Sequence, residues 1–299
     1  MAADLTILYR GPLSSCNYAC EYCPFAKHHE TAAELATDRR ALERFTDWVL
    51  NDAVGKLAIF FTPWGEALTR RWYHDAFRRL SHADHIQRVV AQTNLSGPLD
   101  WLRDTRTDRV ALWCTYHPSE TSRTGFLTRC KQLQDFGIQH SVGMVGRPQD
   151  FDEITVMRAE LPPETYLWIN AYDSGDGTKF PYSPTERNRL TEIDPYFPTN
   201  IVDHPSLGRD CRTGRSVISV DGDGTIRRCH FVRTPIGNIY DPDWQSALTS
   251  RPCPNNTCGC HIGYVHMPEL GQEAIYGDEI LARIPQTRVL EDSTAIPNR

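Results

Sequence analysis

The chain has 299 residues, of which 40% are hydrophobic and 23% charged, and its formal net charge is −6. This composition excludes wholesale disorder and allows one large domain, or one domain with a smaller addition. No block of Lys and Arg indicates nucleic-acid binding, and no apolar stretch is long enough to span a membrane. The N-terminus lacks the basic and apolar regions of a signal peptide, so we expect a cytoplasmic protein.

Short runs rich in Val, Ile, Leu and aromatic residues alternate with helical patterns up to about residue 172. Six such units predict an α/β fold with a parallel sheet, and they are too few for a closed eight-stranded barrel. We therefore expect an open, partial (β/α)6 barrel with its chemistry at the carboxyl ends of the strands. Strands are expected at 5–9, 56–61, 87–93, 109–115, 139–145 and 165–172, and helices at 37–52, 70–82, 99–104, 124–137 and 150–161.

The amino-acid composition changes after residue 172, where Gly, Pro, Asp, Ser and Thr become frequent. One short helix is expected near 184–192. Further on, two β-like runs flank Asp-Gly-Asp-Gly at 221–224, which predicts a β-hairpin. The predicted division is a partial barrel (1–180), a linker (181–204), a small Cys-rich extension that contains the hairpin (205–265) and a C-terminal tail (266–299).

Three of the ten cysteines, Cys16, Cys20 and Cys23, form a C-x3-C-x2-C run directly after the first expected strand. Ten cysteines without an export signal favour metal or redox chemistry over disulfides. Thiolates suit iron–sulfur clusters, and three of them would leave one iron of a [4Fe–4S] cluster open to a chelating molecule. A structural zinc site with His28 or His29 as fourth ligand is the alternative.

The run from Cys16 to Cys23, with Tyr22 before the last cysteine, resembles the motif of the radical S-adenosylmethionine (SAM) superfamily. The resemblance covers roughly residues 5–172 and implies a SAM-binding [4Fe–4S] cluster on the first loop of the barrel. Trp64-Gly65-Glu66 resembles the Gly-Gly-Glu motif that holds the SAM amino group, with Trp64 in place of the first glycine. The resemblance also implies that residues on later strands contact SAM: Thr93, Asn94, Thr115 and Met144. The alternative is that Glu66 is a helix N-cap and that the polar residues are strand-end caps.

The activity that the resemblance implies is the reductive cleavage of SAM. A reduced cluster, supplied by a donor such as flavodoxin or ferredoxin, gives methionine and a 5′-deoxyadenosyl radical that abstracts hydrogen from a substrate. The expected substrate contacts lie past the fourth and sixth strands, at the open mouth of the barrel: Tyr116, His117, Asn170 and Tyr172.

Five further cysteines lie between residues 211 and 260 and bracket the hairpin. This pattern resembles the twitch extension, a shorter relative of the SPASM domain, which implies a second [4Fe–4S] cluster for electron transfer or substrate binding. The expected ligands are Cys211, Cys229, Cys258 and Cys260, with Cys253 as the substitute. A structural zinc module is the alternative.

The sequence thus predicts a radical SAM enzyme that modifies a small polar metabolite or natural-product precursor, with no nucleic-acid or membrane partner. A second hypothesis is a maturase of ribosomally made peptides. Such maturases often begin with a winged-helix domain, for which the 15 residues before Cys16 leave no room. A hypothesis of another class is a non-catalytic, zinc-binding interaction module.

Overall fold

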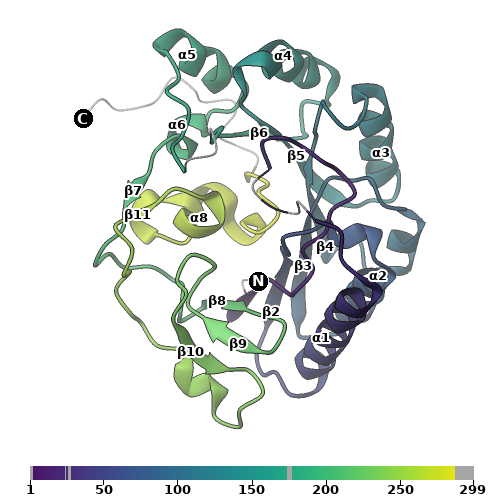
Figure 1. Cartoon of the computed structure of the whole chain (residues 1–299), viewed down its shortest axis with the longest axis vertical. Helices are drawn as coiled ribbons and strands as arrows, with labels where there is room; N and C mark the ends of the chain where they lie inside the picture. Colours follow the sequence, from purple (N-terminus) through teal and green to yellow (C-terminus); the bar gives the residue numbers. More distant parts are fainter. Residues whose placement is uncertain (1–2, 24, 26–27, 174–176, 287–299) are drawn as a thin grey trace.

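The computed structural model describes residues 3–23, 25, 28–173 and 177–286. In this part of the chain, the main sheet has nine strands in the order β10-β9-β8-β1-β2-β3-β4-β5-β6 (Figure 1). The first six in the chain are parallel and lie side by side in chain order, as the alternating pattern predicts. They are β1 (Leu5–Tyr9), β2 (Leu57–Phe61), β3 (Ile86–Thr93), β4 (Val110–Thr115), β5 (Gln139–Val145) and β6 (Leu167–Asn170).

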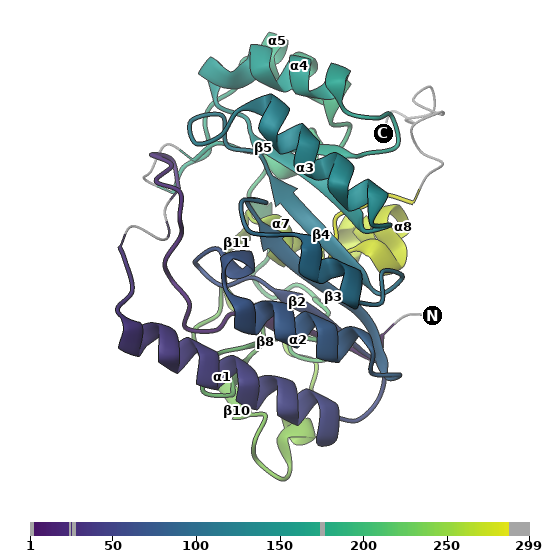
Figure 2. The ribbon, with the colours of Figure 1, turned by 90° about the vertical axis from the view of Figure 1, so that its right-hand side faces the viewer.

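Four helices cover the outer face of the sheet (Figure 2). Alternate strand residues such as Ile7, Ile59 and Leu112 are fully buried against them, which forms the larger hydrophobic core. The short segment expected at 99–104 is a 3-10 helix, η2 (Asp100–Asp104). The covering helices are α1 (Ala32–Asn51), α2 (Arg71–Ser81), α3 (Arg123–Asp135) and α4 (Phe151–Glu160).

Helix α1 begins five residues before the expected start at Thr37. Its N-cap is Thr31, whose side chain accepts from the backbone of Glu34 while the Glu34 carboxylate accepts from Thr31. This capping box satisfies two amide groups that a helix start leaves open. Thr37 lies inside the helix and donates to the carbonyl of Ala33 at 3.0 Å.

The inner face of the sheet is covered by a segment near the C-terminus, residues 261–284 (Figures 1 and 2). Tyr276, Leu281 and Ala282 pack in a second core with strand residues such as Phe60 and Trp168. Much of the segment predicted as a tail is therefore part of the packed structure. It contributes η5 (Pro268–Leu270), α8 (Gln272–Tyr276) and η6 (Gly277–Glu279), after α7 (His261–Tyr264).

The predicted hairpin forms and extends the main sheet. Strand β8 (Val217–Val220) pairs in parallel with β1, and β9 (Thr225–Arg227) and β10 (Pro235–Asn238) follow it in antiparallel order. Gly224 has a φ of +90° in the turn, a conformation that favours glycine. The other elements are η1 (Ala67–Thr69), η3 (Pro148–Asp150), α5 (Pro184–Ile193), α6 (Phe197–Asn200), β7 (His204–Pro205), η4 (Trp244–Ala247) and β11 (Thr257–Cys258).

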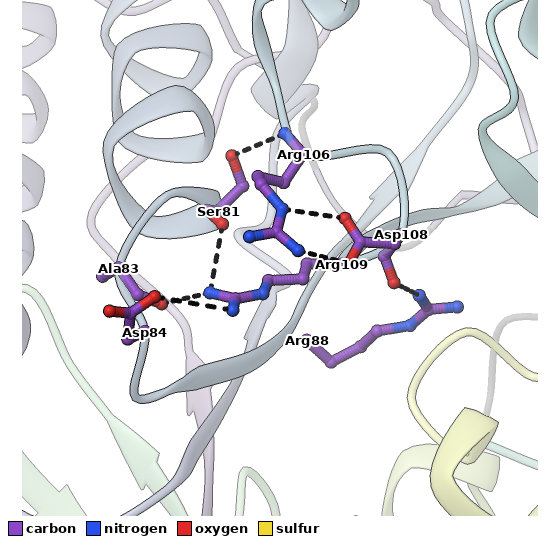
Figure 3. A network of polar contacts seen from close by, with 7 residues as sticks. All are labelled: Ser81, Ala83, Asp84, Arg88, Arg106, Asp108 and Arg109. Atoms are coloured by element: carbon purple, nitrogen blue, oxygen red, sulfur yellow. Dashed lines mark hydrogen bonds and ion pairs between the residues drawn. The ribbon is translucent and has the colours of Figure 1, made fainter.

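A polar network ties together the turns at the amino ends of β3 and β4 (Figure 3). The Arg106 guanidinium donates two hydrogen bonds to the Asp108 carboxylate, at 3.0 and 2.7 Å. Arg88 donates to the Asp108 carbonyl at 3.0 Å and also pairs with Glu279 of the C-terminal segment. Arg109 reaches the carbonyls of Ser81 and Ala83 and lies 3.9 Å from Asp84. The network fixes the end of the sheet opposite the cysteine loop. No helix of the described residues has the length and apolarity of a membrane span.

Candidate functional site

The three N-terminal cysteines lie on the loop between β1 and α1, at the carboxyl ends of the parallel strands. Cys20 is buried, and Cys16 and Cys23 are half-buried. The thiols are close enough to affect one another, since Cys23 and Cys16 both add to the raised pKa of Cys20. The loop therefore gathers the three side chains that the motif predicts.

Two buried or half-buried carboxylates hold this loop in place. Glu30 accepts from the backbone amides of Ser14 and Ser15 at 3.0 and 3.2 Å, and from the Ser15 hydroxyl at 2.5 Å. Asp38 of α1 accepts from the Leu13 amide at 3.1 Å. Burial raises the pKa of Asp38 to about 6. The loop is thus fixed by the start of the helix that follows it.

The thiol environment fits an iron–sulfur cluster. Burial is the main reason that the pKa of Cys20 rises to about 11 and that the pKa of Cys16 is raised. Thiols with such raised pKa values stay protonated at neutral pH, so keeping Cys16 and Cys20 as thiolates needs positive charge such as iron supplies. The Tyr18 amide and the Asn94 side chain donate to the Cys16 sulfur at 3.4 and 3.6 Å. Such hydrogen bonds to sulfur tune iron–sulfur sites.

The described residues present no preformed site for a single metal ion. Among the described residues, no three Cys, His, Asp or Glu side chains converge where a single ion would sit. Zinc needs all its ligands within about 2.3 Å of one ion, whereas a four-iron cluster takes its thiolates on separate irons.

Gly65 packs directly on the cysteine loop. A Cβ at this position would lie 2.1 Å from the Ser15 carbonyl oxygen, so no other residue fits without moving the loop. The Gly65 amide donates to the Leu13 carbonyl and the Glu66 amide to the Ser15 carbonyl, at 3.2 and 3.1 Å. The Gly-Glu pair after β2 is therefore in contact with the start of the cysteine loop, directly before Cys16.

Glu66 is buried and accepts three hydrogen bonds. Its carboxylate accepts from the Leu68 amide at 3.0 Å, the Thr93 hydroxyl at 2.7 Å and the Asn94 amide at 2.6 Å. Burial raises its pKa. The alternative of an N-cap is correct in part, because Glu66 caps η1. The same bonds bring Thr93, Asn94 and Glu66 together at one place, beside Cys16.

Side chains on β4 and β5 alternate between the two faces of the sheet. Thr115 is buried and follows Trp113, which belongs to the inner core, on the same face. Met144 is fully buried in the outer core with Cys114. This corrects the expected placement of Met144 near SAM. Side chains alternate along β5, so the residues directly before and after Met144 face inward, and Met144 itself faces outward.

Two of the expected substrate contacts have other partners. Tyr116 is buried in the outer core, and its hydroxyl donates to Glu153 of α4 at 3.0 Å, which corrects its expected placement at the mouth. His117 lies under the cysteine loop, where its Nδ1 is 2.7 Å from the Tyr22 hydroxyl and burial lowers its pKa to about 4. A neutral imidazole therefore positions Tyr22. Sequence reasoning missed this contact because the two residues are 95 positions apart.

Asn170 is the last residue of the edge strand β6, and Tyr172 follows the strand. Asn170 is exposed, as a mouth residue would be. Tyr172 is half-buried, and its amide donates to the Tyr182 hydroxyl at 2.9 Å. Their roles as substrate contacts stay predictions.

Four of the five C-terminal cysteines surround one cavity in the extension. Burial raises the pKa of Cys229 to about 11 and that of Cys258 to about 12, and the neighbouring thiols add to both shifts. The Thr213 hydroxyl donates to the Cys211 sulfur at 3.2 Å. A Cβ on Gly263 would lie 2.6 Å from the Cys258 sulfur, so the next turn of chain packs closely here. The cysteines that line the cavity are Cys211, Cys229, Cys253 and Cys258.

Cys260 does not line this cavity. Its side chain is exposed to solvent. The geometry therefore favours Cys253 over Cys260 as the fourth residue of the set.

Comparison with solved structures finds the same fold. Native anSMEcpe with bound AdoMet matches with a TM-score of 0.53 at 14% identity, over 82% of this chain and 80% of that one. With the Kp18Cys peptide also bound, the values are 0.54, 13%, 83% and 81%. Streptococcus suis SuiB bound to precursor peptide SuiA gives 0.51 and 12%, over 83% of this chain and 65% of the other.

These neighbours are radical SAM enzymes, so the chain has the fold that the cysteine motif predicts. No protein-family profile matches the chain, and a search of curated proteins finds no match. The assignment of function must therefore be argued from the arrangement of the site residues described above.

Proposed function

We propose that this protein is a radical SAM enzyme whose catalytic [4Fe–4S] cluster is held by Cys16, Cys20 and Cys23. One observation carries the proposal: the three-cysteine loop packs directly on Gly65-Glu66 at the carboxyl end of the parallel sheet, with Asn94 bonded to Cys16. Three thiolates leave a site for SAM on the cluster, and a buried carboxylate lies next to them for its ammonium group. The fold shared with anSMEcpe and SuiB supports the same conclusion.

The bound cluster and SAM would supply the electron and the radical for hydrogen abstraction, and the chain would supply the rest of the site. Glu66 would accept a charge-assisted hydrogen bond from the SAM ammonium. Gly65 allows the loop to approach the strand end. The C-terminal segment excludes water from the inner face of the sheet below the site, because Tyr276 and Leu281 fill it.

We further propose a second cluster in the extension, with Cys211, Cys229, Cys253 and Cys258 as its ligands. The shared cavity and the mutual effect of the thiols support this set. Four protein ligands would close the cluster and favour electron transfer over substrate binding. The competing zinc module would use the same cysteines, so iron and zinc analysis of the purified protein separates the two.

The substrate we favour is a small polar molecule at the mouth of the barrel, beside Asn170. A peptide is the second candidate, since two of the similar structures contain peptides, SuiA with SuiB and Kp18Cys with anSMEcpe. A flavodoxin or ferredoxin would supply the electrons.

The test of the catalytic cluster is SAM cleavage after anaerobic reconstitution and reduction. Single Ala variants of Cys16, Cys20 or Cys23, and the triple variant, should lose at least about 99% of 5′-deoxyadenosine formation, because two thiolates hold a cluster poorly. Cys130→Ala removes a buried thiol from α3 and should keep the activity, which makes it the control. Sustained 5′-deoxyadenosine formation by the triple variant would refute the proposal.

A further inference from the structure

The turn that follows β3, residues 94–97, connects the cysteine loop to Glu66. The Asn94 side chain donates to the Cys16 sulfur at 3.6 Å and to the Asn17 side chain at 3.2 Å. The backbone amide of Asn94 donates to the Glu66 carboxylate at 2.6 Å. The position of this turn therefore sets the position of Asn94 relative to both proposed parts of the SAM site.

Leu95 gives the turn a backbone conformation that residues with a side chain rarely adopt. Its φ is +59°, in the left-handed region that favours glycine. Its side chain is buried in the outer core, so a glycine at this position would relax the backbone but lose the packing. A conformation of this kind persists only where the surrounding structure holds it.

Arg129 of α3 supplies that hold. Its guanidinium donates to two carbonyl groups of the turn, through Nε to Leu95 and through Nη2 to Gly97. Hydrogen bonds from a charged donor are stronger than those between neutral groups. Because the guanidinium is planar and rigid, it also fixes the two carbonyls relative to each other. The arginine therefore spans the strained residue and anchors it to α3.

The end of the turn packs against η1. A Cβ on Gly97 would lie 2.1 Å from the Leu68 carbonyl oxygen, so backbone meets backbone at this point. The Leu68 amide in turn donates to the Glu66 carboxylate at 3.0 Å. The turn thus lies between α3 and the segment that Glu66 caps, and a shift of the turn would displace Asn94 and Glu66 together.

We propose that Arg129 is a positioning residue for the catalytic cluster, because it holds Leu95 in the conformation that bonds Asn94 to the Cys16 sulfur. The inference rests on the proposed function and adds a residue of α3 to the site. Without the guanidinium, Leu95 relaxes to a negative φ, which turns Asn94 away from Cys16. The sulfur then loses this donor and keeps the Tyr18 amide at 3.4 Å.

Two measurements on the cluster-loaded protein test this role in Arg129→Met. A hydrogen bond to sulfur stabilises the reduced, more negative cluster, so its loss should shift the midpoint potential to more negative values. A redox titration followed by electron paramagnetic resonance measures the potential, and the signal that changes when SAM is added identifies the catalytic cluster. Equilibrium dialysis measures SAM affinity, which should fall about fivefold, as for the loss of one ordinary hydrogen bond.

Arg158→Met is the matched control. Arg158 of α4 also donates to backbone carbonyls of a turn, at 2.9, 2.6 and 2.7 Å, which belong to Leu161, Pro162 and Thr165. This turn precedes β6 and so lies at the amino end of the strand, away from the cysteine loop. The control should lower stability in urea and leave the potential and SAM affinity unchanged. Arg129→Lys keeps the charge without the planar fork, and it should give intermediate shifts in both.

Leu95→Gly added to Arg129→Met separates positioning from stability. Glycine adopts a positive φ without strain, so the double variant should regain potential and SAM affinity. Its stability should fall further, because a buried leucine is lost. A purely structural role of Arg129 predicts instead that all three quantities worsen together.

Three results would overturn the inference: unchanged potential and affinity in Arg129→Met, equal shifts in Arg158→Met, or further losses of both in the double variant. If Arg129→Met holds no iron, Arg129→Lys decides, since wild-type values in that variant would refute the role. SAM cleavage by the wild type is measured in the same series. A wild type that cleaves SAM, with Arg129 variants that match it, refutes this inference alone, whereas a wild type without cleavage refutes the proposed function.

Discussion

The carboxylate of Glu66 accepts hydrogen bonds from three donors inside the protein, and burial raises its pKa. Only one of the three bonds reaches Oε2, which leaves this oxygen with acceptor capacity. A structural cap and a ligand for a cation are therefore compatible roles. Removing the side chain would test both roles: loss of the cap should lower stability, and loss of the ligand should lower SAM affinity.

Glu66→Ala should weaken SAM binding to the cluster-loaded protein by about 10- to 100-fold. This follows from a charge-assisted hydrogen bond of about 1.5–3 kcal/mol. Equilibrium dialysis with SAM measures the affinity, and a urea titration measures stability separately. Glu153→Ala, which removes a half-buried carboxylate that binds Tyr116 and Arg123 on the outer side, should leave SAM affinity intact. A folded Glu66→Ala protein that binds SAM with wild-type affinity would show that Glu66 only caps η1.

At the scale of the elements, strands were the most predictable part of the chain. Runs such as 5–9 and 56–61 match β1 and β2 to within one residue, because strands buried on both faces consist of near-continuous apolar residues. The same property hides which face each residue occupies. Met144 was therefore misplaced, and only the pairing of β5 with its neighbours sets its direction.

Residues that act through long-range contacts were the least predictable. Asn94 reaches Cys16 across 78 positions, and His117 reaches Tyr22 across 95. Arg10 shows the contrasting case, since period-two alternation from Leu8 already puts it on the inner face. The sequence does not show what surrounds it, because Trp64, whose ring stacks on the Arg10 guanidinium, comes from another segment.

The extension offers a test between two neighbouring cysteines. Cys253→Ala should lower the iron content of the reconstituted protein from about eight to about four per chain, because one [4Fe–4S] cluster is lost. Cys260→Ala should keep about eight, since Cys260 lies outside the cavity. Iron analysis with electron paramagnetic resonance measures both. The opposite result, with iron lost only in Cys260→Ala, would restore the ligand set expected from the sequence.

For the molecule as a whole, the described residues after α7 complete the barrel-like sheet. Six strands alone leave the inner face open, and the segment after α7 fills it with Tyr276, Leu281 and Ala282. Two polar contacts fasten this segment: Ser141 donates to the Ala282 carbonyl at 2.7 Å, and Arg88 pairs with Glu279. Short 3-10 and helical pieces carry no long periodicity, which explains why the sequence indicated only a polar tail.

This packing predicts that the C-terminal segment contributes to the stability of the whole fold. Leu281 is 5% exposed, so Leu281→Ala should lower the free energy of unfolding by about 2–5 kcal/mol, through lost burial and the cavity left behind. Leu207→Ala makes the same chemical change at a side chain that is 61% exposed, and its cost should stay below about 0.5 kcal/mol. Urea unfolding of the reconstituted proteins, followed by tryptophan fluorescence, measures both. Trp113 and Trp168 lie in the same inner core as Leu281, so their emission reports directly on this region. Equal stability of the two variants would mean that the segment only rests on the sheet, and the inner face would then need another cover to keep water from the site.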